Sequence, residues 1–322
     1  MKKLMLFLFA AFIVIALSAC GSTDKDTSKN GDKTAEAEKG KDTITVKHEL
    51  GETKVPKNPK KVVVFDFGIL DTFDKLGIKP AGIAQKNVPD YLKKYKEGDY
   101  TNIGSLKEPD FEAIANLDPD LIIISGRQSS VYDQLSDLAP TIYLGVNTDD
   151  YMNSFKENTK IVGEIFGKED EVKEELAKVD DAIKALHEKA EKVDKDGLLV
   201  MANDDKMSAF GSKSRFGIIH DVFGIKPTDK DIEASTHGMN VSSEYIMKKD
   251  PSILYVIDRG TAIGEDSSAK KVVENKLVRK TKAYKDGNIV YLKPDIWYLS
   301  GGGLESVSEM ISEIDKSLDE AE

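Results

Sequence analysis

The sequence predicts an α/β protein of two Rossmann-like lobes joined by a single long helix. Two observations carry this prediction. Short apolar runs rich in β-branched residues are followed by segments of helical spacing, which favours strand and helix units. In addition, one unit of helix, breaker and strand occurs twice, 132 positions apart, which indicates two lobes of similar structure.

The first lobe opens with KVVVF at residues 61–65, a run that predicts a buried strand, and residues 69–76 follow with helical spacing. Further on, residues 111–117 predict a short helix that the sequence Asp-Pro-Asp ends, and residues 121–124 predict a strand. The tripeptide SGR comes next, so Arg127 lies at the carboxyl end of this strand.

The second copy of this unit repeats its charged residues as well as its pattern. Glu112 is matched by Glu244, and Arg127 is matched by Arg259, which again follows a strand. Because helix, breaker, strand and arginine all keep one offset, we interpret the match as a structural repeat.

Two further helical patterns lie between the copies. Residues 149–168 carry apolar residues at helical spacing and are expected to form the helix that connects the lobes. Residues 169–193 predict a second helix whose many charges face solvent. We therefore expect an N-terminal lobe at 46–148 and a C-terminal lobe at 169–322.

The first 19 residues have the pattern of a lipoprotein signal peptide. Two lysines precede an apolar run of about 14 residues, whereas a membrane-spanning helix needs roughly 20. The end of the run, Leu17-Ser18-Ala19-Cys20, resembles a bacterial lipobox. We expect a lipid on Cys20 that holds the protein at the extracellular face of the cell membrane. The alternative is that Cys20 is only a small residue near a cleavage site.

Residues 20–45 are expected to be the lipidated cysteine and a flexible tether. From 21 to 41 the chain has no large apolar residue to bury, and a chain of that length spans on the order of 25 Å. Cys20 is the only cysteine, so the exported body must be stable without disulfides. With 57 acidic and 46 basic residues, the protein is a poor partner for nucleic acid.

Three arginines are candidates for holding an anionic ligand. Ligands of open parallel sheets lie outside the carboxyl ends of the strands, where Arg127 and Arg259 fall. Arg215 lies in the turn AFGSKSRFG, whose glycines and serines suit a loop beside a site. The guanidinium group gives bidentate hydrogen bonds to oxygen anions and keeps its charge. The competing interpretation is that these arginines are solvated surface residues.

His237 and Tyr298 are candidates for contact with a metal, because imidazole and phenolate both ligate transition metals. Each alone is more simply an ordinary loop residue. The other histidines lack ligand-like spacing, so any metal is expected to arrive already chelated. The tract Gly301-Gly302-Gly303 either presents helix N-terminal amides to an anion or is a plain junction between loop and helix.

Glu112 and Glu244 allow two interpretations. Each begins a short helix, where a carboxylate favours the helix dipole. The functional interpretation is a matched docking pair, one glutamate per lobe, that fits basic pockets on a two-fold symmetric partner.

Six segments together resemble the lipid-anchored substrate-binding proteins of iron-siderophore ABC importers, and specifically the petrobactin-type catecholate binders of Gram-positive bacteria. The resemblance covers essentially the whole mature chain. The segments are VPKNPKKVVVFDFG, GSLKEPDFEAIANLDPDLIIISGR, AFGSKSRFG, STHGMNVSSEY, VIDRGTAIG and WYLSGGG.

This resemblance implies a class III substrate-binding protein fold with a shallow cleft for an Fe(III)-siderophore complex, without any further cofactor. It also implies a monomer that docks on an ABC permease dimer served by its ATPase. Three arginines would surround the ferric catecholate, a histidine and a tyrosine would complete iron coordination, and two glutamates would dock on the permease. By number these are Arg127, Arg215 and Arg259, then His237 and Tyr298, then Glu112 and Glu244.

Two alternatives to a ferric catecholate receptor stay open at this point. The ligand could be another iron complex, haem or a hydroxamate siderophore, although a hydroxamate complex is often neutral or cationic and suits three arginines poorly. An exported hydrolase is the alternative from a different class. The chain has no nucleophile elbow, no metal-protease helix and no convincing pair of catalytic carboxylates, so we expect no enzyme.

Overall fold

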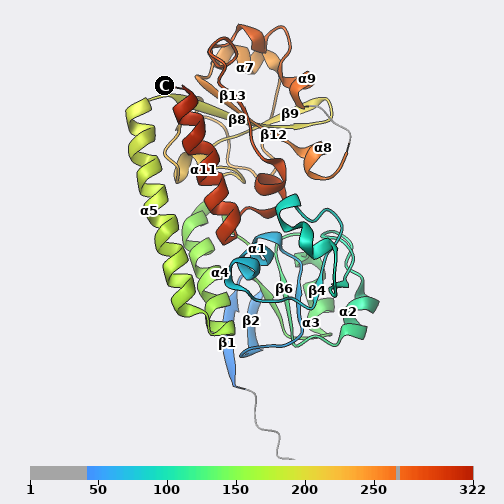
Figure 1. Cartoon of the computed structure of the whole chain (residues 1–322). Helices are drawn as coiled ribbons and strands as arrows, with labels where there is room; N and C mark the ends of the chain where they lie inside the picture. Colours follow the sequence, from blue (N-terminus) through green and yellow to red (C-terminus); the bar gives the residue numbers. More distant parts are fainter. Residues whose placement is uncertain (1–41, 266–268, 322) are drawn as a thin grey trace, which may run out of the picture. The chain divides into compact units, whose positions relative to one another are not determined.

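A computed structural model describes residues 42–265 and 269–321 (Figure 1). The signal peptide expected at 1–19, the lipidation site Cys20 and the tether up to residue 41 lie outside the described residues. Within residues 42–321, the chain forms two α/β lobes, each on its own sheet, as the sequence predicts. Among the described helices, none has the length and apolar character needed to cross a membrane.

The N-terminal lobe is built on a five-stranded sheet of order β5-β4-β3-β6-β7, in which all pairs are parallel. Its strands are β3 (Val62–Val64), β4 (Gly82–Ile83), β5 (Thr101–Asn102), β6 (Leu121–Ile124) and β7 (Thr141–Tyr143). Its helices are α1 (Phe67–Leu76), η1 (Asp90–Lys96), α2 (Phe111–Leu117), η2 (Ser129–Val131), α3 (Tyr132–Ser136) and η3 (Thr148–Asp150). Strands β3 and β6 are buried along their whole length, as expected for parallel strands covered on both faces.

An antiparallel hairpin of β1 (Thr43–His48) and β2 (Gly51–Pro56) precedes this sheet. Because β1 begins at Thr43, residues 43–45 are strand, and the expectation that the tether extends to residue 45 is wrong. The physical reason is that Val46 and Val55 bury their side chains in the core, which fixes the hairpin to the lobe. The alternating sequence TITV has the period of a half-buried strand.

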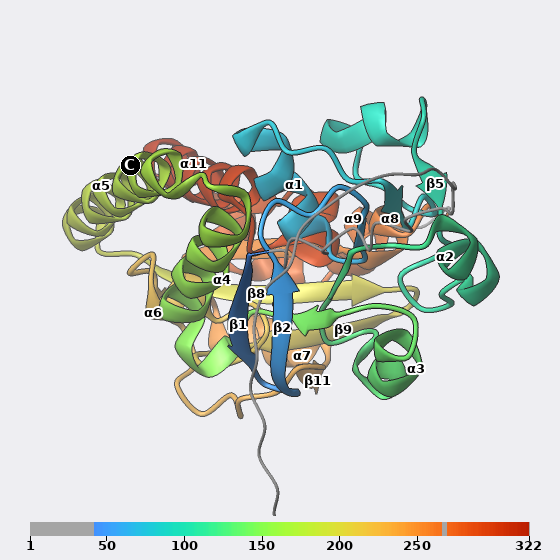
Figure 2. The same ribbon diagram turned by 90° about the horizontal axis from the view of Figure 1, so that it is seen from below.

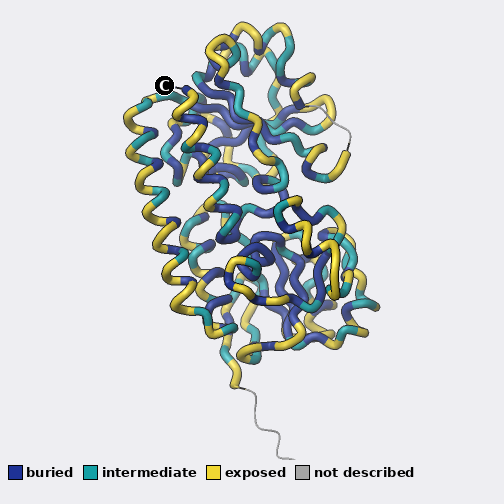
Figure 3. Tube along the Cα trace, in the orientation of Figure 1, coloured by how far each residue is buried: buried dark blue, intermediate teal, exposed yellow. Residues whose placement is uncertain are grey.

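The C-terminal lobe has a six-stranded sheet of order β11-β9-β8-β12-β13, with β10 paired to β8. Its strands are β8 (Asp196–Asn203), β9 (Lys206–Phe210), β10 (Lys226–Pro227), β11 (Met239–Val241), β12 (Ile253–Asp258) and β13 (Ile289–Tyr291). Its shorter helices are α6 (Ile218–Asp221), α7 (Ser243–Lys249), α8 (Arg259–Ala262), α9 (Ala269–Val273), η4 (Val278–Lys280) and α10 (Lys282–Lys285). Strands β8, β12 and β13 are parallel, whereas β9 runs antiparallel to β8. Figure 3 shows the buried residues concentrated along the strands of both lobes.

The repeat predicted from the sequence is confirmed. Helices α2 and α7 have seven residues each, and both end in a left-handed aspartate, Asp118 (φ 51°) and Asp250 (φ 49°). Ile114 and Ile246 occupy equivalent places and are both fully buried. In each lobe the following strand, β6 or β12, then leads to an arginine.

Three long helices flank the lobes, namely α4 (Tyr151–Phe166), α5 (Glu169–Val193) and α11 (Leu304–Ala321). Helix α4 packs on the N-terminal lobe, where the Asn158 side chain donates to Leu144 O at 3.0 Å. Helices α5 and α11 lie side by side in both views (Figures 1 and 2), and Lys189 of α5 pairs with Asp315 of α11 at 2.9 Å.

Helix α5 is the element that passes from one lobe to the other. Near its start, Glu175 pairs with Lys75 of α1 at 3.4 Å, and near its end His187 packs against Gly224 of the C-terminal lobe. The expectation that residues 149–168 make this connection therefore needs correction. A helix of 25 residues is about 37 Å long, enough to pass along both lobes, whereas α4 buries its apolar face on one.

The chain enters α11 through three glycines, of which Gly302 and Gly303 are tightly enclosed. A Cβ atom at Gly303 would lie 1.9 Å from Asp71 Oδ1 and 2.1 Å from Gly68 O, so no side chain fits there. We expect Gly303→Ala to lower the free energy of unfolding by about 3 kcal/mol, because backbone or a buried carboxylate must move. Urea denaturation would measure this loss.

Gly77→Ala is the matched control for this substitution. Gly77 has open space around its Cβ position and a φ of +69°, so alanine there incurs only a backbone cost of about 1 kcal/mol. Equal losses for the two variants would contradict the close contact at Gly303.

Candidate ligand-binding site

A cavity of about 990 Å³ is lined by residues of both lobes and of α4. From the N-terminal lobe it is lined by residues that follow β3, β6 and β7, and from the C-terminal lobe by the turn after β9 and the loop before β11. A short π-helical turn, η5 (Asp295–Ser300), adds Trp297 and Tyr298. The expectation that a cavity lies at the carboxyl ends of parallel strands thus holds for the N-terminal lobe.

The three predicted arginines converge on Tyr298. Arg127 Nη2 donates to Tyr298 O at 3.1 Å, and Arg215 Nη2 donates to the same carbonyl at 2.7 Å. Arg259 Nε donates to the Tyr298 hydroxyl at 3.1 Å. Residues from positions 127, 215, 259 and 298 are therefore brought to one place, although the chain separates them widely.

Arg127 and Arg215 form the cationic wall of the cavity. Burial lowers the pKa of Arg215, and the neighbouring charge of Arg127 lowers it further. The Arg215 guanidinium also lies 4.4 Å from the centre of the Tyr298 ring, a favourable cation–π distance. The two guanidinium groups repel each other and share one carbonyl oxygen, although each has five N–H donors. Such a pair favours the binding of an anion, which accepts hydrogen bonds from both groups.

Arg259 has a different position from the other two. It is not among the residues that line the cavity, and its Nη1 donates to Asn203 Oδ1 at 2.6 Å. Its contact with the site is the hydrogen bond to the Tyr298 hydroxyl. Asn203, at the carboxyl end of β8, was missed by the sequence reasoning, although the strand-end rule that selected Arg259 applies to it equally.

The Tyr298 hydroxyl lies in an environment that favours its phenolate form. Burial raises the pKa of Tyr298, but the hydrogen bond from Arg259 and the charges of Arg215 and Arg259 outweigh it, so the pKa is lower than usual. A phenolate is a good ligand for a ferric ion. His237 is exposed on another part of the cavity wall, in the loop that precedes β11.

A metal ion could also be held by a cluster of the protein's own side chains. Among residues 42–265 and 269–321, no group of three or more His, Cys, Asp or Glu side chains could hold a metal ion. Whether a metal arrives already chelated stays a prediction.

Asp66 is a cavity residue that the sequence reasoning missed. It follows β3 as Arg127 follows β6, and its Oδ1 accepts the backbone N–H of Ile69 at 3.0 Å as the N-cap of α1. Burial raises the pKa of Asp66, while a hydrogen bond from Ser125 and the charge of Arg127 oppose this effect. Asp66 therefore gives the Arg127 loop a fixed acidic neighbour, and the strand-end rule would have found it.

Composition holds a further signal that was overlooked. The chain has 46 basic residues, of which only four are arginines: Arg127, Arg215, Arg259 and Arg279. Three of the four surround Tyr298. Where lysine is the usual surface cation, rare arginines are good candidates for a site that needs planar, permanently charged donors.

The amides at the start of α11 do not face the cavity. Leu304 N donates to Thr72 Oγ1 at 3.2 Å, and the amides of Glu305 and Ser306 donate to Asp71 at 3.2 and 3.0 Å. The glycine tract is thus a structural junction, and the alternative that these amides bind an anion is wrong.

Glu112 and Glu244 are both exposed, in the first turns of α2 and α7. Neither is the N-cap of its helix, because Asp110 and Ser242 fill that place. A hydrogen bond from Ser242 lowers the pKa of Glu244. The two glutamates therefore occupy equivalent exposed places, one on each lobe.

With this fold and this site, the chain belongs to the periplasmic binding protein family, whose model matches residues 62–296. The family and the class III fold predicted from the sequence are thereby confirmed.

Particular relatives are close. The chain is 55% identical to the petrobactin-binding protein YclQ of Bacillus subtilis, over 99% of this chain and 100% of the relative. The crystal structure of YclQ matches with a TM-score of 0.86 at 59% identity, covering 87% of this chain and 99% of that one. The periplasmic catecholate-siderophore binding protein VctP of Vibrio cholerae matches with a TM-score of 0.81 at 36% identity, covering 85% of this chain and 100% of that one.

Proposed function

We propose that this protein is an extracytoplasmic solute-binding lipoprotein that captures a ferric catecholate siderophore of the petrobactin type for an ABC importer. The observation that carries the proposal is the pair Arg127 and Arg215, one from each lobe, on one carbonyl in the cavity wall. The similarity to proteins named for petrobactin and for catecholate siderophores supports this ligand class. It is a receptor rather than an enzyme.

The anionic iron complex would attract both guanidinium groups, and this attraction would offset the repulsion between them. A hydrogen bond to a charged group contributes about 1.5 to 3 kcal/mol. The net charge of −11 opposes binding only weakly, because charges beyond about 8 Å are screened at physiological salt. Tyr298 and His237 would reach the iron where the siderophore leaves coordination positions open, and Arg259 would hold the Tyr298 hydroxyl in place.

A competition experiment tests the ligand class. Ferric petrobactin bound to the protein should be displaced by another ferric catecholate and should resist a ferric hydroxamate or haem at equal concentration, because these lack the concentrated negative charge. Displacement by the hydroxamate with equal potency would contradict the catecholate assignment and favour the wider class of iron ligands.

The proposal includes the membrane and the permease. A lipid on Cys20 would keep the monomeric receptor at the cell surface, at high effective concentration beside the permease dimer and its ATPase. Cys20→Ala should leave ferric petrobactin affinity unchanged in solution but reduce iron uptake by cells about tenfold or more, because the effective concentration is lost.

Uptake of radioactive iron from the ferric siderophore would measure this effect. Ser18→Ala, a substitution two residues away that keeps the cysteine, is the matched control and should support normal uptake. Normal uptake by the Cys20 variant as well would contradict the role of the anchor.

A further inference from the structure

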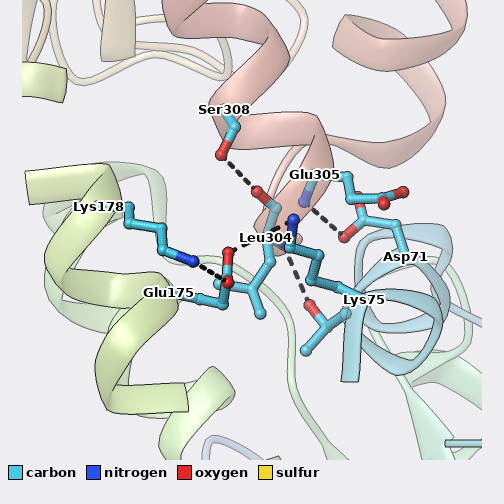
Figure 4. Close-up of polar contacts among 8 residues, drawn as sticks. Asp71, Lys75, Glu175, Lys178, Leu304, Glu305 and Ser308 are labelled. Carbon is cyan, nitrogen blue, oxygen red and sulfur yellow. Dashed lines mark hydrogen bonds and ion pairs between the residues drawn. The ribbon is translucent and has the colours of Figure 1, made fainter. Parts of the chain in front are cut away.

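A buried carboxylate, Asp71, lies where the N-terminal lobe meets helix α11. It belongs to α1, is 0% exposed, and accepts the backbone N–H groups of Glu305 at 3.2 Å and Ser306 at 3.0 Å. The Tyr91 hydroxyl of η1 donates to the same carboxylate at 3.0 Å. Figure 4 shows Asp71 beside the first turn of α11, with Leu304 and Glu305. This buried carboxylate therefore accepts hydrogen bonds from three protein donors in place of water.

Asp71 and its neighbour Thr72, both on α1 of the N-terminal lobe, together cap the start of α11. The first amides of an α-helix have no acceptor within the helix. Here Thr72 Oγ1 accepts from Leu304 N at 3.2 Å, and Asp71 takes the next two amides. A carboxylate at this end is also attracted by the positive end of the helix dipole, and α11 has 18 residues. The contact thus ties α1 to α11 directly.

The segment held in this way leads to the ligand site. Only the three glycines 301–303 separate α11 from η5, the turn that carries Tyr298. At Gly303 the backbone is packed so closely against Gly68 and Asp71 that it cannot move toward α1. A displacement of the first turn of α11 would therefore move the Tyr298 carbonyl that Arg127 and Arg215 share.

We propose that Asp71 is a positioning residue for the ligand site, because its carboxylate fixes the start of α11 to α1 and so places Tyr298 between Arg127 and Arg215. Asp71 does not line the cavity and would touch no ligand. The proposal rests on the proposed function, because ferric petrobactin is the probe of the site.

The charge of Asp71 can change near neutral pH. Burial raises its pKa to about 7, against the hydrogen bonds from Ser306, Glu305 and Tyr91. Burial raises the pKa of Tyr91 and of Tyr151, and the charge of Asp71 adds to both effects, so both phenols stay neutral. Protonation of Asp71 below pH 7 would remove the charge that holds the amides of α11.

Four other charged groups lie near the junction. Burial raises the pKa of Glu305 on α11, and the charge of Asp74 on α1 adds to the effect. Burial likewise raises the pKa of Asp66, which precedes α1. Lys75 on α1 pairs with Glu175 of α5 instead, as Figure 4 shows. Because these groups are present in wild type and variant alike, only the difference between the two proteins isolates Asp71.

Asp71→Asn tests the proposal, since asparagine keeps the size and one acceptor but never carries charge. At pH 8 we expect the Kd for ferric petrobactin to rise about tenfold, the effect of losing a charge-assisted contact. At pH 6, where the wild-type carboxylate is mostly protonated, the two proteins should agree within about twofold. A purely structural role would weaken binding equally at both values.

Asp74→Asn is the matched control. Asp74 lies three residues along the same helix, where it accepts from the Tyr95 hydroxyl at 3.0 Å and pairs with Lys94. The Asp74→Asn protein should keep the wild-type affinity for ferric petrobactin and the wild-type pH profile. If Asp71→Asn also keeps them, or if both variants lose affinity alike, the proposal is overturned.

A second measurement needs neither ligand nor variant. In the wild-type protein, the amide proton shifts of Glu305 and Ser306 should move together between pH 5.5 and 8.5, with one midpoint near 7. Shifts that stay constant would overturn the role of Asp71. Failure of the wild type to bind ferric petrobactin would instead count against the proposed function, so the two failures can be told apart.

Discussion

Replacing both Arg127 and Arg215 by alanine should weaken ferric petrobactin binding by a factor on the order of 1,000 or more. Each arginine donates to the Tyr298 carbonyl from its own lobe, and both line the cavity. If each charged contact contributes about 2 kcal/mol, the loss of two gives close to three powers of ten. Isothermal titration calorimetry with the wild type and the double variant would measure this difference.

Arg279→Ala is the control for this prediction. Arg279 is the fourth arginine of the chain and belongs to η4, where its side chain donates to Glu274 O at 3.0 Å. It should bind with wild-type affinity. Circular dichroism should show the same fold in all three proteins, and a double variant that is folded and binds normally would mean that the ligand lies elsewhere.

Charge reversal at both docking candidates, Glu112→Lys with Glu244→Lys, should stop iron uptake while leaving ligand affinity unchanged. Both side chains are exposed and lie outside the cavity, one in the first turn of α2 and one in that of α7. Two lysines facing basic pockets would repel the permease, and like charges across an interface cost several kcal/mol. Uptake of the ferric siderophore by cells, together with a titration of the purified variant, would measure the two effects separately.

The matched control reverses two other exposed glutamates, Glu164 on α4 and Glu174 on α5, so that the net charge changes equally. This control should support normal uptake. If the Glu112 and Glu244 variant also takes up iron normally, both residues have only the local role of acids in the first turn of a helix, and the docking surface must be sought elsewhere.

The parts of the fold that could be predicted are those with strong local patterns. Helix α2 and strand β6 have the bounds expected from the sequence, and the repeat then locates α7 and β12. Helices α4 and α5 also match the two expected helical patterns. The patterns do not predict which of the two helices passes between the lobes. Periodicity specifies a helix and its buried face, whereas the partner of that face is decided by tertiary packing.

Elements with weak patterns were missed or assigned wrongly. The β1 and β2 hairpin is short and polar on one face, and its first residues continue a polar segment, so part of it was assigned to the tether. Strand β11 and strand β9, which runs antiparallel to both of its neighbours β8 and β11, also have no clear signal in the sequence.

Most residues of the candidate site could be predicted from the sequence, whereas the geometry of the site could not. The strand-end rule and the motif likeness select Arg127, Arg215, Arg259 and Tyr298, and the structure brings all four together. That Arg259 is held by Asn203, away from the cavity, depends on which side chains meet after folding. Asp71 could not be found for the same reason, because the two amides that donate to it lie more than 230 positions further along the chain.

The most direct test of the central claim is a titration of the protein, without residues 1–19, with ferric petrobactin. Trp297 is the only tryptophan, lines the cavity and adjoins Tyr298, so its fluorescence reports on the site. We predict saturable quenching with one ligand per protein and a Kd below about 1 μM, equivalent to roughly −8 kcal/mol. No saturable change at micromolar ferric petrobactin would contradict the assignment of this protein as a ferric catecholate receptor.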